Sequence, residues 1–201
     1  MDYSFYKDAV PLLEGAQSEI LTRLSTIRNY LVSQNMRDPV EHILSRIKTE
    51  ESMKEKLKRK GLPITLDSAL NGVYDAVGVR VICSYINDIY TVRDILKEQD
   101  DIEITEEKDY IKNPKPNGYR SYHMIIKIPV HLGVSKSMSY VEIQLRTIAM
   151  DCWASLEHLM KYKKNIKHQE LIVAELKRCA DEIASTDISM QTIHDLIESN
   201  E

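Results

Sequence analysis

The segment Val77–Cys83 constrains the fold more than any other part of the chain, because it is mostly apolar and rich in β-branched side chains. A short run of this kind predicts a buried strand. Three more strands are predicted, near residues 102–104 and over residues 122–130 and 139–146, and Gly133 lies in the hairpin between the last two. The centre of the chain is therefore predicted to form a β-sheet.

Helical spacing of apolar residues brackets these strands on both sides. Residues 1–37 predict one long amphipathic helix. Asp38 and Pro39 suit the cap and the first position of a second helix, which is predicted to pause at residues 45–48. A helix is predicted to resume after Thr49 and to end at Gly61. Further helices are predicted over residues 87–97, 147–163 and 168–200. The expected architecture is an α+β domain with a mixed sheet and long helices at both ends.

Composition argues against several classes of protein. The net charge is −4, which disfavours a uniformly basic nucleic-acid binder, and no apolar run is long enough for a transmembrane helix. The N-terminus lacks the basic and apolar regions of a secretory signal. The cysteines number 3 and form no CxxC pair, which is typical of a reducing cytoplasm and not of a disulfide framework or a zinc site.

Basic residues gather in two segments of this mildly acidic chain. Residues 46–60 hold seven Lys or Arg against three glutamates, and residues 108–127 hold five with Asp109 as the only acid. Such segments can gather phosphate at one place. A solvated helix face is the simpler explanation of the first segment, whereas the second also contains prolines, a glycine and aromatic residues.

Polar residues mark two of the predicted strands. Asp75 stands at the entrance of one strand and Arg80 lies within it, where each charge needs a partner, water or a ligand; a structural salt bridge is the alternative. Strict alternation places Glu142, Gln144 and Arg146 on one face of another strand, which is also the pattern of a solvent-facing edge. Asp75 and Glu142 together offer two carboxylates, which suit Mg²⁺ completed by phosphates and water.

The loop over residues 112–123 combines a rigid backbone with cationic and aromatic side chains. Prolines and Gly118 shape the loop, its lysines and arginine can neutralise phosphate, and its tyrosines offer planar faces to a base. A tight turn alone needs none of these side chains. The loop therefore indicates nucleotide binding.

Four motifs follow one another over roughly residues 39–163. They are Arg46-Ile-Lys48 followed by Ser52 and Lys56; Asp75-Ala-Val-Gly78-Val-Arg80; Tyr110-Ile-Lys112 leading into Asn117-Gly-Tyr119-Arg-Ser-Tyr-His123; and Val141-Glu142-Ile-Gln144-Leu-Arg146-Thr followed by Ala149-Met-Asp-Cys-Trp153-Ala and Glu157-His158. Together they resemble the synthetase domain of the RelA/SpoT family. The length of the chain is similar to that of the stand-alone small alarmone synthetases of the RelQ type.

The resemblance implies transfer of the β,γ-pyrophosphate of ATP to the ribose 3′-hydroxyl of GDP or GTP, with GMP left open. The products would be AMP and ppGpp or pppGpp, the signals of the stringent response. The implied fold is the nucleotidyltransferase fold of polymerase-β type. Negative charge develops on phosphate oxygens in such a transfer, so Mg²⁺ and fixed cations would supply much of the catalysis.

The resemblance also assigns roles to individual residues. Asp75 and Glu142 match the Mg²⁺ carboxylates, and Glu142 is also the candidate base for the 3′-hydroxyl. Tyr119 matches the aromatic residue that stacks on guanine. The ATP side comprises Arg46, Lys48, Ser52, Lys56, Arg80 and Lys108, with the guanidinium planes of Arg46 and Arg80 suited to adenine. The other residues on the guanine-nucleotide side are Lys112, Lys115, Asn117, His123, Gln144, Arg146 and Asp151.

Two positions depart from the family pattern. Lys108 stands in place of an arginine and keeps the charge without the bidentate fork. Asp151 stands in place of an asparagine, and its carboxylate could accept from guanine N1 and N2. No hydrolase or regulatory domain accompanies the synthetase motifs, so synthesis without degradation is expected.

Two other functions stay open from the sequence. A different nucleotidyltransferase, acting on RNA or a small molecule, would carry a DxD pair, whereas the acids here are split between Asp75 and Glu142. A non-catalytic nucleotide- or RNA-binding regulator would lack one metal carboxylate.

The terminal helices predict self-association, because their apolar stripes exceed what one small sheet covers. The resemblance implies a homotetramer and leaves regulation by (p)ppGpp or RNA open, while the cysteine usage favours a cytoplasmic location. A monomer with both helices on its own sheet is the alternative.

We expect one domain over residues 1–201, with an N-terminal helix (1–37), a catalytic core (38–164) and a C-terminal helix for oligomerisation (165–201). The stripe residues are Leu12, Ile20, Leu24, Ile27 and Leu31, then Ile172, Leu176, Ile183, Ile188, Ile193 and Ile197.

Overall fold

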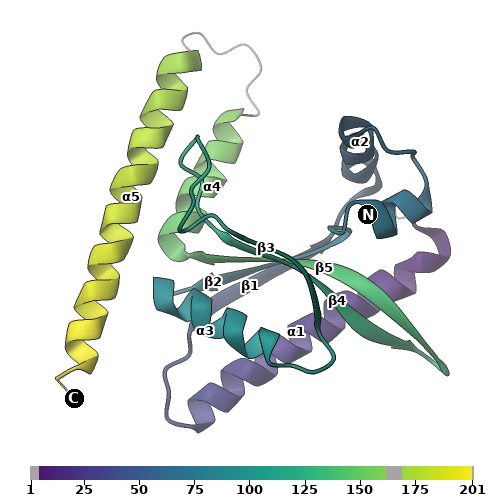
Figure 1. Ribbon diagram of the computed structural model, residues 1–201, viewed down its shortest axis with the longest axis horizontal. Helices are drawn as coiled ribbons and strands as arrows, with labels where there is room; N and C mark the ends of the chain where they lie inside the picture. The colour runs from purple at the N-terminus through teal and green to yellow at the C-terminus, as the bar shows by residue number, and fades with distance from the viewer. Residues whose placement is uncertain (1–4, 162–168, 201) are drawn as a thin grey trace.

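The computed structural model describes residues 5–161 and 169–200. Helices lie on both sides of a five-stranded sheet (Figure 1). Besides a 3₁₀ turn (Lys7–Ala9) and a π turn (Ser68–Gly72), the elements are α1 (Val10–Ser33), β1 (Val40–Ile47), α2 (Glu50–Lys60), β2 (Val77–Cys83), α3 (Ile86–Lys97), β3 (Glu103–Asp109), β4 (Tyr122–Leu132), β5 (Ser135–Thr147), α4 (Ile148–Lys161) and α5 (Gln169–Glu198).

The sheet is mixed, with the strand order β1-β2-β5-β4-β3. Strands β2 and β5 run parallel, and the other neighbours are antiparallel. The α+β prediction is therefore confirmed. The β4–β5 hairpin is longer than predicted, because Gly133 adopts a φ of +63° and allows a tight turn. Residues 163 and 168, where two predicted helices were expected to end and begin, lie outside the described residues.

The helix predicted to begin at Asp38 is wrong, since Val40–Ile47 is the edge strand β1. Val40, Ile43 and Ile47 have helical spacing, but a β-bulge between Val40 and His42 shifts the alternation by one residue. The bulge lets all three side chains face the core, so a strand reproduces the spacing of a helix. The next prediction is confirmed, because the Thr49 side chain caps α2 and Gly61 ends it with a φ of +68°.

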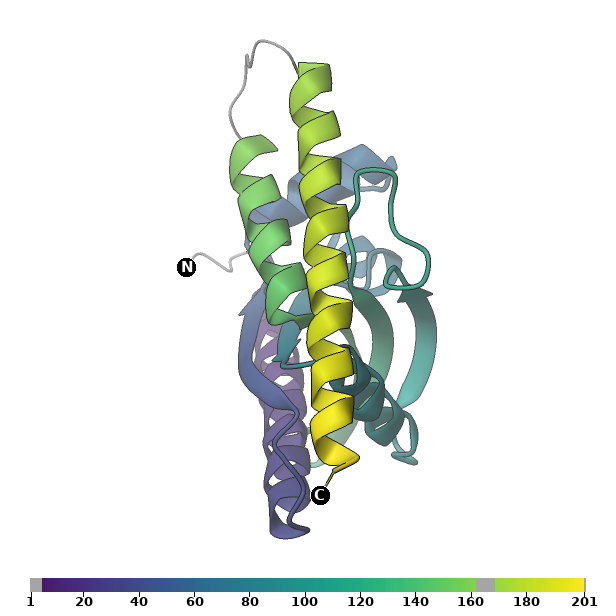
Figure 2. The same ribbon diagram turned by 90° about the vertical axis from the view of Figure 1, so that its left-hand side faces the viewer.

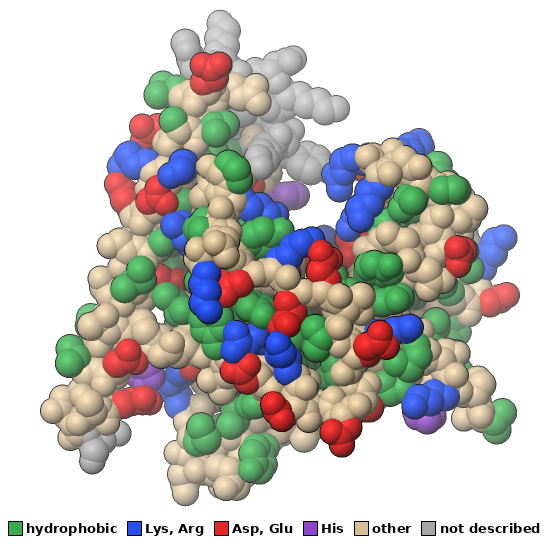
Figure 3. Space-filling model, in the orientation of Figure 1, with side chains coloured by type: hydrophobic (Ala, Val, Ile, Leu, Met, Phe, Trp, Pro, Cys, Tyr) green, Lys and Arg blue, Asp and Glu red, His purple; other side chains and the backbone are tan. Residues whose placement is uncertain are grey.

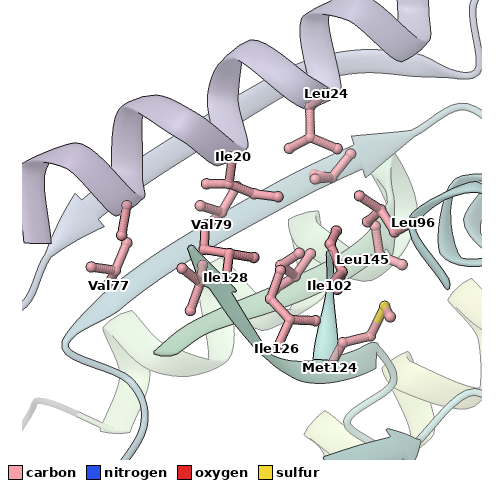
Figure 4. Packing of buried hydrophobic residues seen from close by; sticks show 14 of the residues in the cluster. Ile20, Leu24, Val77, Val79, Leu96, Ile102, Met124, Ile126, Ile128 and Leu145 are labelled. Carbon is pink, nitrogen blue, oxygen red and sulfur yellow. The ribbon is translucent and has the colours of Figure 1, made fainter. Parts of the chain in front are cut away.

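Helices α1 and α3 cover one face of the sheet and enclose the main core with it (Figures 1 and 2). Alternation along the strands supplies the apolar side of this core. In Figure 4, Ile20 of α1 points toward Val79 of β2 and Ile128 of β4, and Leu24 of α1 lies on the side of Leu96 of α3. All five side chains are at most 1% exposed.

The predicted apolar stripe on the first helix is buried within the chain's own core. Ile20, Leu24, Ile27 and Leu31 of α1 belong to the core and are at most 7% exposed. The stripe predicted on this helix is therefore not the surplus apolar surface that was expected. The surplus lies on α5 instead, where Ile188 and Ile193 are more than half exposed. No helix in the described part of the chain has the length and apolarity to cross a bilayer.

Helices α4 and α5 pack against each other beyond one end of the sheet (Figures 1 and 2). Trp153 of α4 is 4% exposed, and its indole Nε1 donates to the backbone oxygen of Leu176 on α5 at 2.9 Å. Ala154 and Ala180 complete this second cluster. Because α2 stands toward the other end, the sheet face opposite α1 is left open between α2 and α4. Figure 3 shows a hollow there, with Lys and Arg side chains around it.

Candidate active site

A cavity of about 230 Å³ lies on the open face of the sheet. The pairing of three adjacent strands forms its floor. In this pairing, Arg46 of β1 lies opposite Gly78 of β2, and Gly78 lies opposite Glu142 of β5. A Cβ atom at Gly78 would meet nothing within 4 Å, so the floor is open above this residue. The cavity is lined by Leu44, Ser45, Arg46, Lys48, Asp75, Gly78, Val79, Arg80, Glu142 and Gln144.

Asp75 lies at the end of the cavity near α2 and is 7% exposed. Its Oδ2 atom accepts hydrogen bonds from Lys48 Nζ and, at 2.5 Å, from Lys56 Nζ. Its Oδ1 atom is buried and has no hydrogen-bond partner among the described residues. Burial lowers the pKa of Lys48, although Asp75 opposes the shift. The two lysines thus hold one carboxylate oxygen and leave the other for a ligand.

Glu142, Gln144 and Arg146 lie on the open face of β5, as the alternation predicted. Gln144 Nε2 donates to Glu142 Oε2 at 2.9 Å, and Arg146 Nη2 donates to Gln144 Oε1 at 3.0 Å. Strand β5 lies between β2 and β4, so the alternative of a solvent-facing edge strand is wrong. The face of a central strand instead presents a hydrogen-bonded row of polar groups to the cavity.

Tyr119 and His123 extend this row toward the loop. The Tyr119 hydroxyl accepts from Arg146 Nη2 at 2.7 Å and lies 2.8 Å from His123 Nε2. Burial first, and then the charges of Arg146, Lys115 and Lys108, lowers the pKa of His123 to about 3. The ring is therefore neutral at pH 7, and this network favours the tautomer in which Nε2 accepts from the hydroxyl. Its Nδ1 atom then faces Glu142 Oε1 at 3.8 Å.

Two arginines share one carboxylate at the α4 end of the cavity. Asp151 Oδ1 lies 2.8 Å from Arg146 Nη1 and 3.1 Å from Arg80 Nη1. Arg80 therefore pairs with Asp151, while Asp75 pairs with lysines, and the structural salt bridge considered for Asp75 and Arg80 is not formed. Burial, and then the charge of Arg146, lowers the pKa of Arg80, so an anion placed between them would be favoured.

The loop before β4 is fixed against α4 and α5. Asn117 Nδ2 donates to Glu157 Oε1 of α4 at 3.0 Å, and Arg120 Nη1 donates to the backbone oxygen of Ala180 on α5 at 3.3 Å. Lys115 Nζ lies 4.6 Å from the centre of the Tyr119 ring. These contacts set the position of the Tyr119 ring.

Three of the predicted site residues lie outside this cluster. Ser52 is exposed, and its backbone N–H donates to the Thr49 side chain in the cap of α2. Lys108 is half exposed and pairs with Glu106 at 2.6 Å. Lys112 is 69% exposed, and its Nζ atom lies 5.1 Å from the centre of the Tyr90 ring on α3, the helix on the opposite face of the sheet.

Sequence reasoning gave no role to some residues that build the site. Gly78 and Leu44 line the cavity because they alternate with core residues on β2 and β1. The alternation signal could have placed Gly78 there. For Leu44 the signal was hidden, because its strand was predicted to be a helix.

The metal implied by the sequence resemblance fits the donor set. In the described residues no three His, Cys, Asp or Glu side chains form a metal cluster of their own. Mg²⁺ needs fewer protein ligands, because it binds one or two carboxylates together with phosphates and water. The unpartnered Oδ1 of Asp75 and the carboxylate of Glu142 line the same cavity and suit this role.

Comparisons with known proteins agree with this geometry. Residues 45–167 match a family model described as a region found in RelA/SpoT proteins. The chain is 44% identical over 176 residues to the GTP pyrophosphokinase YwaC of Bacillus subtilis, covering 88% of this chain and 80% of the relative. Two solved structures from the same organism are similar. Small alarmone synthetase 2 has a TM-score of 0.83 at 41% identity, covering 94% of this chain and 98% of that one. Small alarmone synthetase 1, bound to its product pppGpp, has a TM-score of 0.86 at 30% identity, covering 98% of this chain and all of that one.

Proposed function

This chain belongs to the RelA/SpoT family, and we propose that it is a GTP pyrophosphokinase that makes alarmones. It would transfer the β,γ-pyrophosphate of ATP to the 3′-hydroxyl of GDP or GTP, which yields AMP and ppGpp or pppGpp. The observation that carries the proposal is the cavity itself, where Asp75 and Glu142 meet Lys48, Arg46 and Arg80. Two carboxylates among fixed cations suit a reaction that builds negative charge on phosphate oxygens.

We assign the phosphates of ATP to the end of the cavity near α2 and its adenine to Arg46 and Arg80, of which Arg80 reaches Asp151 at the α4 end. Lys48 and Lys56, which hold Asp75, would neutralise the phosphates of ATP. Arg46 and Arg80 reach the cavity from β1 and β2, and their planar guanidinium groups would stack on adenine. Ser52 and Lys108 would contact the nucleotide from the rim.

We assign the guanine nucleotide to the end formed by the loop and α4. The ring of Tyr119 would stack on guanine, supported by Arg146, Gln144 and Asp151. Lys115, Asn117 and His123 would line the part of the site that holds the phosphates of the guanine nucleotide. The proposal omits Lys112, because its amine lies over Tyr90 on the other side of the sheet.

Glu142 would accept the proton of the 3′-hydroxyl as the nucleophile attacks the β-phosphorus. Its Oε2 atom is held by Gln144, which aims the carboxylate into the cavity. Pyrophosphokinases of this family use a divalent metal, and we propose Mg²⁺ held by Asp75 and Glu142. When bound, the ion would draw negative charge from the transferring phosphate oxygens.

Product analysis tests this function directly. The protein is incubated with ATP, Mg²⁺ and either GMP, GDP or GTP, and the nucleotides are separated by chromatography. We expect AMP and a 3′-pyrophosphorylated guanine nucleotide in equal amounts, with Glu142→Gln as the inactive control. Release of ADP without a guanine product would contradict the proposal.

Self-association and location are separate proposals. We propose a homotetramer that uses α5, whose Ile188, Ile193 and Ile197 are 59%, 53% and 56% exposed. Light scattering checks this, and a particle with the mass of one chain would refute it.

We also propose a cytoplasmic role in the stringent response, with (p)ppGpp or RNA as candidate regulators. The free thiols of Cys83, Cys152 and Cys179 are consistent with that compartment.

A further inference from the structure

Tyr74, directly before Asp75, has an unusual backbone conformation. Its φ angle is +55°, in the left-handed region. A bulky residue with a β-carbon rarely adopts this region, and strained residues of this kind collect at functional sites where the surrounding structure holds them. The neighbouring residues must therefore stabilise Tyr74 in this conformation.

The ring of Tyr74 is held by the ring of Tyr140 on β5. The two ring centres are 4.3 Å apart and the planes are inclined by 40°. Tyr140 lies two residues before Glu142, on the same face of the strand. The stack therefore joins the residue before Asp75 to the strand that carries Glu142.

A cation and a cavity adjoin this stack. Lys127 of β4 lies opposite Tyr140 in register, and its Nζ atom is 5.3 Å from the centre of the Tyr140 ring. Both tyrosines also line a cavity of about 340 Å³, together with Leu12 and Leu13 of α1. Because the two tyrosines border a cavity, the contact between their rings is a restraint that close packing does not replace there.

We propose that the Tyr74–Tyr140 stack is a positioning element that fixes Asp75 relative to Glu142 and thereby sets the affinity of the site for its divalent ion. The proposal rests on the metal role proposed above for the two carboxylates. Mg²⁺ demands near-ideal octahedral geometry, so a small rotation of the Asp75 carboxylate weakens metal binding more than nucleotide binding. The tyrosines themselves do not touch the reacting atoms and act through Asp75.

Direct metal binding tests the proposal with Mn²⁺ as the probe, titrated by electron paramagnetic resonance in the presence of a non-hydrolysable ATP analogue. Tyr74→Asn keeps a residue that tolerates the left-handed backbone but removes the ring. Tyr140→Leu removes the partner ring and leaves Tyr74 intact. Each variant should raise the dissociation constant of Mn²⁺ by about fivefold to tenfold, while KM for ATP at saturating metal changes by less than about twofold. Tyr74→Phe and Tyr140→Phe keep both rings, so each should bind Mn²⁺ with the wild-type dissociation constant.

Tyr85→Leu is the matched control, since it removes the stacked pair of Tyr85 and His194 at α5, whose rings are 4.1 Å apart. It should leave Mn²⁺ binding unchanged. One outcome would overturn the positioning role but keep the metal assignment. In it, Asp75→Asn binds Mn²⁺ more weakly, whereas Tyr74→Asn and Tyr140→Leu both bind it as the wild type does. Unchanged binding in Asp75→Asn would refute the metal assignment, and the proposal with it. If Tyr74→Asn does not fold, Tyr140→Leu and Tyr140→Phe decide the question.

Discussion

The two ends of the cavity hold their carboxylates in different ways. At the α2 end, Asp75 is buried and one of its oxygens is bound by two lysines. At the β5 end, Glu142 is held by the neutral amide of Gln144 and faces a neutral His123. Under the proposed function, the lysines beside Asp75 would also neutralise phosphate, and Glu142, oriented by an amide, would act as the base. The two carboxylates thus differ in their partners, which are lysines for Asp75 and an amide for Glu142.

Removing the acid of β5 should have the largest effect. Glu142→Gln is nearly isosteric and keeps a partner for Gln144, so the fold should survive. We expect turnover to fall by about 10²-fold or more, the scale of a lost general base. Steady-state kinetics with ATP and GDP, together with thermal unfolding, measure both effects. Near-normal turnover in the variant would refute the role of Glu142 and the division between the two ends.

The aromatic ring at the same end should govern only one substrate. Tyr119→Ala should weaken binding of GDP by about 1–3 kcal/mol, the scale of base stacking, with little effect on ATP. Tyr119→Phe is the matched control, because it keeps the ring and loses the hydrogen bond from Arg146. Calorimetry with each nucleotide measures the difference. Equal weakening of ATP and GDP would show that Tyr119 is not the guanine platform.

Local sequence patterns predicted most of the sheet and one face of the site. The β-branched run became β2, and the alternation of Glu142, Gln144 and Arg146 placed these residues on one face of β5. Thr49 and Gly61 were identified as the ends of α2 because capping needs particular side chains at particular positions. Each of these signals is contained within a few residues of the chain.

The remaining features depend on contacts between segments far apart in the sequence. The bulge in β1 is defined by its pairing with β2, so its spacing resembled a helix until the partner strand was known. Lys48 and Lys56 were assigned to ATP phosphates, but their pairing with Asp75 spans 27 and 19 residues. The stack of Tyr74 on Tyr140 and the covered stripe of α1 likewise follow from tertiary packing, which single-sequence periodicity does not encode.

A side chain on the floor between the two ends should block the cavity without disturbing the fold. A Cβ atom at Gly78 meets nothing within 4 Å, so Gly78→Leu would project into the cavity between Arg46 and Glu142. We expect binding of ATP to weaken by about tenfold, or about 1.4 kcal/mol, with the unfolding temperature nearly unchanged. Gly78→Ala should have a smaller effect. Calorimetric titration of both variants measures this, and wild-type affinity in Gly78→Leu would mean that ATP binds elsewhere.

The neutral state of His123 can be examined through pH. The folded protein holds the pKa of His123 at about 3, below the value of about 6.5 for an exposed histidine. Between these values the unfolded chain binds the proton and the folded protein does not, so stability rises with pH across this window and is lost as pH falls through it. The slope contributed by His123 should be at most about 1.4 kcal/mol per pH unit. Denaturant unfolding of the wild type and His123→Asn, from pH 7 downward, isolates this contribution, because the amide does not titrate. Identical slopes in the two proteins would mean that the fold does not hold His123 neutral.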